Sequence, residues 1–288
     1  MNNQSLVSIM MPVHNGEDTL HIAVSSLINQ TYTNWKCIIV NDGSTDGTMG
    51  ILDCLDDERF VVIHFEQNKG RPYARQAALE LADGEYLSFL DADDFYHPDK
   101  IDSQVKIFES NSKISLVSCG NASFDSNMKL VSVRGTSQKD GALKKFRYGP
   151  VLNVAMRTSM VKLGMAKKVN FDVKLLYSQD VDFLTRYLHD KYYYVQDKVY
   201  YYYSELVSVN KSKILNTYHY GIKRNLGYIN RFNKIKVLKS ITIIALKYSF
   251  FTLRLMLQND KNIIAKRGRK PLPDEVATFK DTILKLDE

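Results

Sequence analysis

The chain has 288 residues, of which 44% are hydrophobic and 25% are charged, and its formal net charge is +7. This size and balance are ordinary for a globular protein with one good core and an appendage. The N-terminus lacks a basic region followed by a long apolar run, so no signal peptide is expected. The three cysteines lack metal-ligand spacing, which indicates a reduced cytosolic protein rather than a zinc or disulfide scaffold.

Short apolar runs alternate with helix-like segments through the first hundred residues. The expected strands are 6–11, 36–40, 61–65 and 86–90, and the expected helices are 19–30, 71–81 and 100–109. This alternation is typical of an α/β fold with a mostly parallel central sheet flanked by helices. Each strand runs out into polar residues. Because ligands bind beyond the carboxyl ends of the strands in such sheets, these strand ends are expected to form a binding edge.

Three aspartates, Asp91, Asp93 and Asp94, follow the apolar run 86–90. Carboxylates this close together repel one another, so they are a poor choice for stability alone. A divalent cation would remove the conflict, since Mg²⁺ and Mn²⁺ favour carboxylate oxygens and keep substrate phosphates as further ligands. Taken alone, the stretch is equally consistent with an acidic surface loop or a helix cap.

Four motifs, in order, resemble those of the family 2 glycosyltransferases, a large inverting group with the GT-A nucleotide-diphosphosugar fold. They are residues 12–15, 40–46, 68–76 and 91–94. The resemblance is specific because all four occur in the family's order, and it covers roughly the first 110 residues. It implies a GT-A domain with a mostly parallel sheet and a helical C-terminal extension.

The resemblance also divides the chain. It implies a catalytic domain over 1–215, in which 1–110 bind the nucleotide-sugar and 111–215 bind the acceptor. The remaining residues, 216–288, form the basic helical extension. The later half resembles the family less closely. There we expect a helix over 158–163, strands over 192–195 and 199–203, and a polar, turn-rich region over 121–141 that includes a loop over the donor.

Individual donor-binding residues follow from the same resemblance. The implied set is Pro12, Val13, Asp42, Asn68, Arg75, Asp91 and Asp93. Asp42 would accept a hydrogen bond from the uracil imide, as an ionised carboxylate can. Arg75 would hold the nucleotide phosphate or a strand-end aspartate, the alternative being a helix-surface charge. Asp91 would lie near the ribose and Asp93 would bind Mn²⁺ or Mg²⁺. Asp94 either supports this site or caps the next helix.

An inverting transfer also needs a base on the sugar face opposite the leaving group. The family places it in a Glu-Asp pair at a helix start, about 90 residues past the Asp-x-Asp pair. Asp180 matches that aspartate, whereas Gln179 stands in place of the glutamate. We therefore expect Asp180 to be the catalytic base. The alternative is that Ser178 and Asp180 only begin the helix, where the dipole favours an anion. Asp182 is the spare carboxylate and is expected to be structural.

The tail is strongly basic. Between Lys211 and Lys270 there are 15 Lys or Arg residues and one acid, Asp260, so this stretch is +14 and the rest of the chain is −7. Such asymmetry indicates an anionic partner. Its apolar run 241–257 has only 17 residues and two cations, which is too short and too charged for a membrane span. Two interpretations stay open: a helix in the interface of an anionic membrane, or a helix packed on protein with solvated lysines.

Together these features predict a metal-dependent inverting hexosyltransferase. It would move a sugar from a UDP-hexose or UDP-N-acetylhexosamine to a hydroxyl of a glycan or lipid-linked saccharide, in bacterial surface polysaccharide or lipopolysaccharide synthesis. We expect a cytoplasmic location, peripheral at the inner face of the cell membrane. One alternative is a non-catalytic sugar-nucleotide-binding scaffold, which the intact Asp91, Asp93 and Asp180 disfavour. Another is nucleic-acid binding through the tail. No nucleic acid is expected, because no known binding module is recognised.

Overall fold

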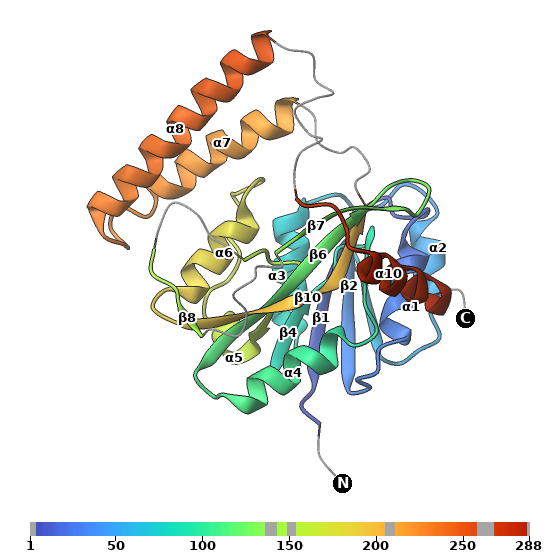
Figure 1. Cartoon of the computed structure of the whole chain (residues 1–288). Helices are drawn as coiled ribbons and strands as arrows, with labels where there is room; N and C mark the ends of the chain where they lie inside the picture. The colour runs from blue at the N-terminus through green and yellow to red at the C-terminus, as the bar shows by residue number, and fades with distance from the viewer. Residues whose placement is uncertain (1–3, 136–142, 149–153, 205–210, 258–267, 287–288) are drawn as a thin grey trace.

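The computed structural model describes residues 4–135, 143–148, 154–204, 211–257 and 268–286. Helices flank a twisted central sheet (Figure 1). The strands are β1 (Val7–Val13), β2 (Trp35–Asn41), β3 (Phe60–His64), β4 (Tyr86–Phe89), β5 (Asp94–Tyr96), β6 (Ile114–Phe124), β7 (Leu130–Arg134), β8 (Lys144–Lys145), β9 (Met160–Lys162) and β10 (Tyr192–Ser204). The helices are α1 (Leu20–Ile28), α2 (Thr48–Asp53), α3 (Arg71–Leu81), α4 (Lys100–Ser110), α5 (Leu163–Ala166), α6 (Gln179–Leu188), α7 (Lys211–Leu226), α8 (Lys234–Leu257) and α10 (Pro273–Leu286).

The sheet is parallel in its first half and mixed in its second. The strand order is β3-β2-β1-β4-β9-β6-β10-β5, with β7 paired to β6 and β8 to β10. β1 to β4 pair in parallel, as their near-continuous apolar sequences predict for strands covered on both faces. In the register of β1 and β2, Val13 lies opposite Asn41. The two strands therefore end level, and their polar tips share one edge of the sheet.

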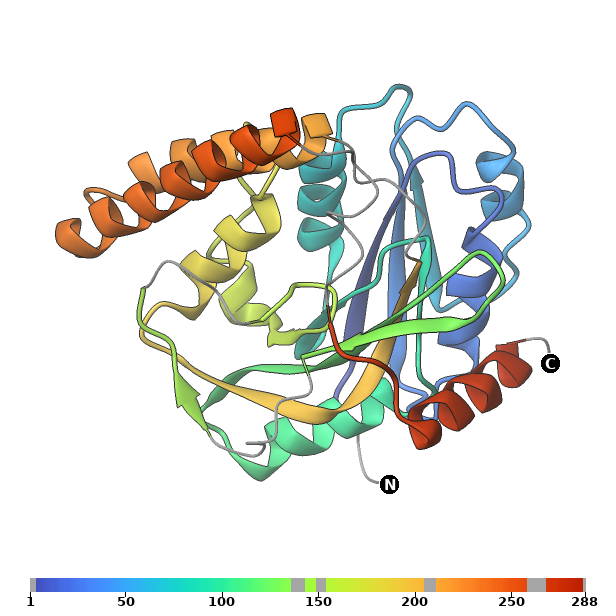
Figure 2. The same ribbon diagram turned by 45° about the horizontal axis from the view of Figure 1, so that its top comes forward.

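Each face of the sheet has its own core. α1 and α4 cover one face, where Leu20, Leu27 and Val105 are buried. α3, α5 and α6 cover the other, where Ala78 and Phe183 are buried. Figure 2 shows the two helical layers on either side of the strands. The helices thus bury their apolar sides and leave the strand ends free to carry polar groups.

The second half corrects three expectations. The helix expected over 158–163 is wrong: Met160 and Val161 are fully buried in β9, which pairs antiparallel with both β4 and β6. Pairing on both sides outweighs the local helical pattern. The strands expected over 192–195 and 199–203 are one strand, β10, with register shifts in between. The region 121–141 continues β6 and turns into β7, while 136–142 lie outside the described residues.

The C-terminal helices lie on two different sides of the domain. α7 and α8 run side by side as a hairpin, and Tyr228 in the turn between them hydrogen-bonds Asp182 of α6, whereas α10 returns to the opposite side near α1 (Figures 1 and 2). Phe279 of α10 is buried against Phe95 and Tyr202. Residue 269 also forms a bridge to Val133 of β7. The domain boundary at 215 stays a prediction, with α10 packed on the sheet beyond it.

Candidate active site

The end of β2 is tied to the loop before α3. The Asp42 carboxylate accepts backbone N–H groups from Lys69 at 2.7 Å and Gly70 at 2.9 Å, and its side chain is buried. Gly43 has a φ of +63°, and a Cβ there would lie 2.3 Å from the carbonyl carbon of Gln67. Only glycine tolerates both conditions. The tip of β2 and the segment 67–70 thus form one rigid wall of the strand-end edge.

Asp91 lies at the end of β4 among three arginines. The Arg75 guanidinium, which is buried, lies 3.1 Å from the Asp91 carboxylate. Burial by itself raises the pKa of Asp91, but the charges of Arg71, Arg75 and Arg157 outweigh it and lower that pKa. Asp91 is therefore held as a carboxylate.

The two following aspartates have opposite surroundings. Asp93 is exposed, and its carboxylate accepts no hydrogen bond from a described side chain. Asp94 is buried and accepts hydrogen bonds from the Tyr201 hydroxyl at 2.7 Å and the Ser204 amide at 3.2 Å. Burial, then the neighbouring Asp93 and Asp91 charges, raise the pKa of Asp94 well above its usual value. The hydrogen bonds of Asp94 thus connect β5 to β10, and Asp94 does not cap α4.

The first turn of α6 carries Asp180 and Asp182 on different faces. Asp182 is buried, pairs with Arg186 and accepts a hydrogen bond from the Tyr228 hydroxyl. Asp180 is half-buried and lines a cavity. Ser178, just before the helix, has a left-handed φ of 61°, which is strained for a residue with a Cβ. This turn directs Asp180 away from the partners that hold Asp182.

One cavity of about 660 Å³ joins the end of β4 to the start of α6. Its walls include Asp91, Arg71, Arg157 and Asp180, and α7 contributes Thr217. The structure therefore brings together three of the predicted groups, Asp91, Arg75 and Asp180. Pro12 and Val13 end β1 at the same sheet edge beside Asp42, whose backbone amide donates to the Val13 carbonyl at 2.8 Å.

Asn68 is exposed in the loop that contacts Asp42. No described group of three or more His, Cys, Asp or Glu side chains is arranged to hold a metal. These residues fit a cation if Asp93, an exposed carboxylate beside a second carboxylate, supplies one ligand. A bound diphosphate and water would then supply most of the others. Loss of hydration next to the sheet edge and then the charge of Asp91 raise the pKa of Asp93, so a nearby cation would favour its ionised form.

Two arginines that line the cavity, Arg71 and Arg157, were not among the predicted site residues. Arg71 begins α3 within the third motif, 68–76, so its position in the motif was an available signal. Arg157 gave none, because its segment was expected to lead into a helix and instead leads into β9. Its contact with the sheet edge arises only from the pairing of β9 with β4 and β6.

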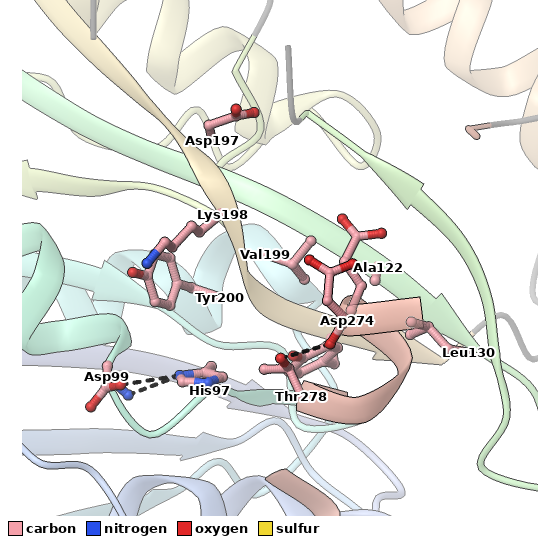
Figure 3. A pocket seen from close by; sticks show the side chains of 12 residues that line it. His97, Asp99, Ala122, Leu130, Asp197, Lys198, Val199, Tyr200, Asp274 and Thr278 are labelled. Carbon is pink, nitrogen blue, oxygen red and sulfur yellow. Dashed lines mark hydrogen bonds and ion pairs between the residues drawn. The ribbon is translucent and has the colours of Figure 1, made fainter. Parts of the chain in front are cut away.

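A second cavity, of about 440 Å³, lies under α10 on another part of the molecule (Figure 3). His97, Lys198, Tyr200, Asp274 and Thr278 line it. His97 pairs with Asp99 and packs edge-on against Tyr200, and burial lowers its pKa. This cavity contains none of the predicted donor or base residues.

The chain belongs to the family 2 glycosyltransferases. The family model described as "Glycosyl transferase family 2" matches residues 8–159, which span the four motifs and the strands that carry them. The predicted family and GT-A fold are confirmed by this match and by solved structures. One of these, Staphylococcus aureus TarS 1–349 in complex with UDP-GlcNAc, has a TM-score of 0.68 and 18% identity, over 97% of this chain and 81% of that one.

Two bacterial proteins resemble the N-terminal part. A putative teichuronic acid biosynthesis glycosyltransferase, TuaG of Bacillus subtilis, is 41% identical over 113 residues, covering 38% of this chain and 45% of that protein. WfaP of Escherichia coli, named a UDP-Glc:alpha-D-GlcNAc-diphosphoundecaprenol beta-1,3-glucosyltransferase, is 40% identical over 105 residues, or 36% of this chain and 42% of that protein. The matched segment thus spans less than half of each relative.

Proposed function

We propose that this protein is an inverting glycosyltransferase that transfers a hexose or N-acetylhexosamine from a UDP-sugar to a hydroxyl of a glycan acceptor. The cavity shared by Asp91 and Asp180 carries the proposal, because the end of β4 lines it on one side and the start of α6 lines it on the other. No hydrogen-bond partner of the Asp180 carboxylate is found among the described residues. The names of WfaP and of the TarS complex, which specify UDP-glucose and UDP-GlcNAc, support this donor class.

Asp180 is the proposed base. It takes the proton of the acceptor hydroxyl while that oxygen bonds to the anomeric carbon, and the bond from this carbon to the diphosphate oxygen breaks. The electron pair of that bond leaves with the nucleoside diphosphate. Asp182 is excluded from this role by its contacts with Arg186 and Tyr228, which occupy both carboxylate oxygens.

A divalent cation is part of the proposal. The residue that would hold Mn²⁺ or Mg²⁺ is Asp93, and a bound cation would offset charge on the phosphates of the leaving group. Asp91 would face the ribose, held in place by Arg75. Asp42 keeps lone pairs beyond its two backbone contacts, so it can also accept a hydrogen bond from the imide N–H of uracil. The uracil ring would then lie between Pro12 or Val13 on one side and Asn68 on the other.

We infer that the acceptor is a lipid-linked saccharide and that α8 rests on an anionic membrane surface. The segment 211–257 has ten Lys or Arg residues and no acid. Along α8, apolar side chains at helical spacing are exposed, namely Ile235 (75%), Leu238 (55%), Leu246 (65%), Phe250 (67%) and Leu253 (56%). A basic helix with an exposed apolar stripe suits the interface of a bilayer. Among the described helices, none has the length and apolarity to cross one.

The position of the hairpin supports this acceptor class. α7 contributes Thr217 to the cavity wall, and α8 lies beside α7. A saccharide carried at the membrane surface would therefore reach Asp180 from the side on which α8 meets the lipid.

The activity is tested by incubating purified full-length protein with Mn²⁺ and a panel of UDP-sugars. Transfer to a lipid-linked saccharide, or slow hydrolysis of one donor, is expected. Neither reaction with any donor would contradict the proposed enzyme. Donor binding without any turnover would instead favour a non-catalytic sugar-nucleotide scaffold.

A further inference from the structure

Arg157 is a half-buried cation with unsatisfied donors. Its guanidinium carbon lies 3.9 Å from the centroid of the Tyr203 ring, and its Nε is buried without a hydrogen-bond partner among the described residues. The buried Tyr203 hydroxyl likewise has no partner in this part of the chain. A buried donor without an acceptor costs stability, so such a group calls for an explanation. A bound ligand that supplies acceptor oxygens is one.

Arg71 lies in the same cavity wall. It is exposed at the start of α3, and no hydrogen bond from it to a described residue is found. Its charge is close to those of Asp91, Asp93 and Asp180. The cavity therefore presents a second guanidinium whose five N–H donors are available.

The charges of the cavity are not balanced pairwise. Arg75 already pairs with Asp91, and Tyr201 already donates to Asp94. Arg71 and Arg157 are the cavity cations left over. Guanidinium groups bind phosphate oxygens through two parallel N–H donors, which gives both charge and orientation.

We propose that Arg71 and Arg157 bind the diphosphate of the donor in the cavity that Asp91 also lines. The inference rests on the proposed function and deepens it. The two side chains carry part of the charge that develops on the leaving nucleoside diphosphate, so the chain does not depend on a cation alone for this task. UDP therefore keeps measurable affinity after chelation of divalent metal, and Arg157 and Arg71 account for it.

Titration calorimetry with UDP and with uridine, each in Mn²⁺ and in EDTA, tests this. Arg157→Met should weaken UDP binding about tenfold to a hundredfold, the range for hydrogen bonds to charged groups, and leave uridine binding unchanged. The loss should be larger in EDTA. Arg157→Lys should recover only part of it. Arg231→Met, which removes an exposed arginine outside this cavity, is the matched control and should bind UDP like the wild type.

The Arg71 side chain is exposed, so Arg71→Met should fold. Its UDP affinity tests the inference if Arg157→Met does not fold. Unchanged UDP affinity in both arginine variants would overturn the inference and leave the proposed function intact. Equal losses for UDP and uridine would also overturn it, because they would indicate a structural role. A wild-type protein that binds no UDP would end the proposed function together with the inference.

Discussion

At the sheet edge, two carboxylates have fixed partners: Asp91 pairs with Arg75 at 3.1 Å, and Asp94 accepts a hydrogen bond from Tyr201 at 2.7 Å. On α8, by contrast, Lys234 and Lys236 are exposed, and no acid occurs anywhere in 211–257. Groups held in one geometry suit a ligand of defined shape, whereas mobile cations beside apolar side chains suit a surface without fixed shape. Under the proposed function, the donor would be bound by groups of fixed geometry, and the membrane surface by flexible cations and exposed apolar side chains.

The same contrast separates the two ends of the C-terminal region. Phe279 of α10 is 1% exposed and packs with Phe95, Phe124 and Tyr202. Phe250 of α8 is 67% exposed. One helix completes the core of the domain, and the other leaves its apolar side uncovered. The C-terminal region therefore contains one helix that packs in the core and one helix with an exposed apolar side.

The largest expected effect is at the fixed-geometry end of the comparison. Asp180→Asn should lower kcat by about 10²–10⁴-fold, the usual contribution of a general base, while donor affinity stays within about twofold. Asp182→Asn, the matched variant two residues on, should instead destabilise the fold by about 3 kcal/mol, since it breaks a buried ion pair. Steady-state kinetics and donor titration measure the first, and urea unfolding measures the second. An Asp180→Asn enzyme with more than about a tenth of wild-type kcat would contradict the assignment.

The two phenylalanines give the next largest effect. Phe279→Ala should cost about 3–5 kcal/mol of unfolding free energy, as truncation of a buried aromatic does. Phe250→Ala should change stability by no more than about 0.5 kcal/mol, because its side chain is exposed. Urea denaturation of both variants makes the comparison. A large cost at Phe250 would show that the face of α8 is covered by protein rather than open to lipid.

A buried cation offers a pH test of the same contrast. Lys100 is fully buried, hydrogen-bonds Ser88 and Gln104, and burial lowers its pKa to about 8 from 10.5. Between these values the unfolded chain binds the Lys100 proton and the folded chain does not, so the contribution of Lys100 to stability should rise by about 3 kcal/mol from pH 8 to 10.5, at 1.36 kcal/mol per pH unit. Burial raises the pKa of the Cys37 and Cys119 thiols, so their contribution falls in the upper part of this window, and the Lys100 contribution is measured as a difference between variants.

Urea unfolding across this pH window checks the rise. The difference in unfolding free energy between the wild type and Lys100→Met should therefore rise with pH, whereas Lys236→Met on α8 should keep the wild-type pH dependence, because Lys236 is exposed. The same pH dependence in the wild type and in Lys100→Met would show that the Lys100 ammonium is not destabilised by burial.

The smallest single-residue effect is expected on α8. Full-length protein should pellet with anionic liposomes at low salt and dissociate at high salt, since each cation near the surface contributes about 1 kcal/mol and salt screens it. Lys236→Gln should weaken liposome binding by about fivefold, and Phe250→Ala should weaken it without changing the salt dependence. Full-length protein that stays in the supernatant with anionic liposomes at low salt would contradict the membrane assignment.

The sequence predicts the parallel half of the sheet well, because each strand is an apolar run that ends in a polar motif. Asp42, Asp91 and Asp180 were selected through the resemblance to the family, whose motifs these residues match at strand ends and at a helix start. β9 and the position of Arg157 could not be predicted, since both depend on pairing between strands far apart in the chain. The burial of Phe279 depends on the return of α10 to the sheet, which no local pattern encodes.

The most direct test of the central claim is a thermal-shift screen of full-length protein against UDP, UDP-glucose, UDP-GlcNAc and GDP-mannose, with and without Mn²⁺. Ligand at a hundred times its dissociation constant adds about 2.7 kcal/mol to the stability of the native state, which raises Tm by several degrees. We expect such a shift for a uridine nucleotide, and a larger one with Mn²⁺. In Asp93→Ala the shift with Mn²⁺ should fall to the value that the wild type shows in EDTA. No shift with any nucleotide, in a protein that still binds anionic liposomes, would contradict the central claim.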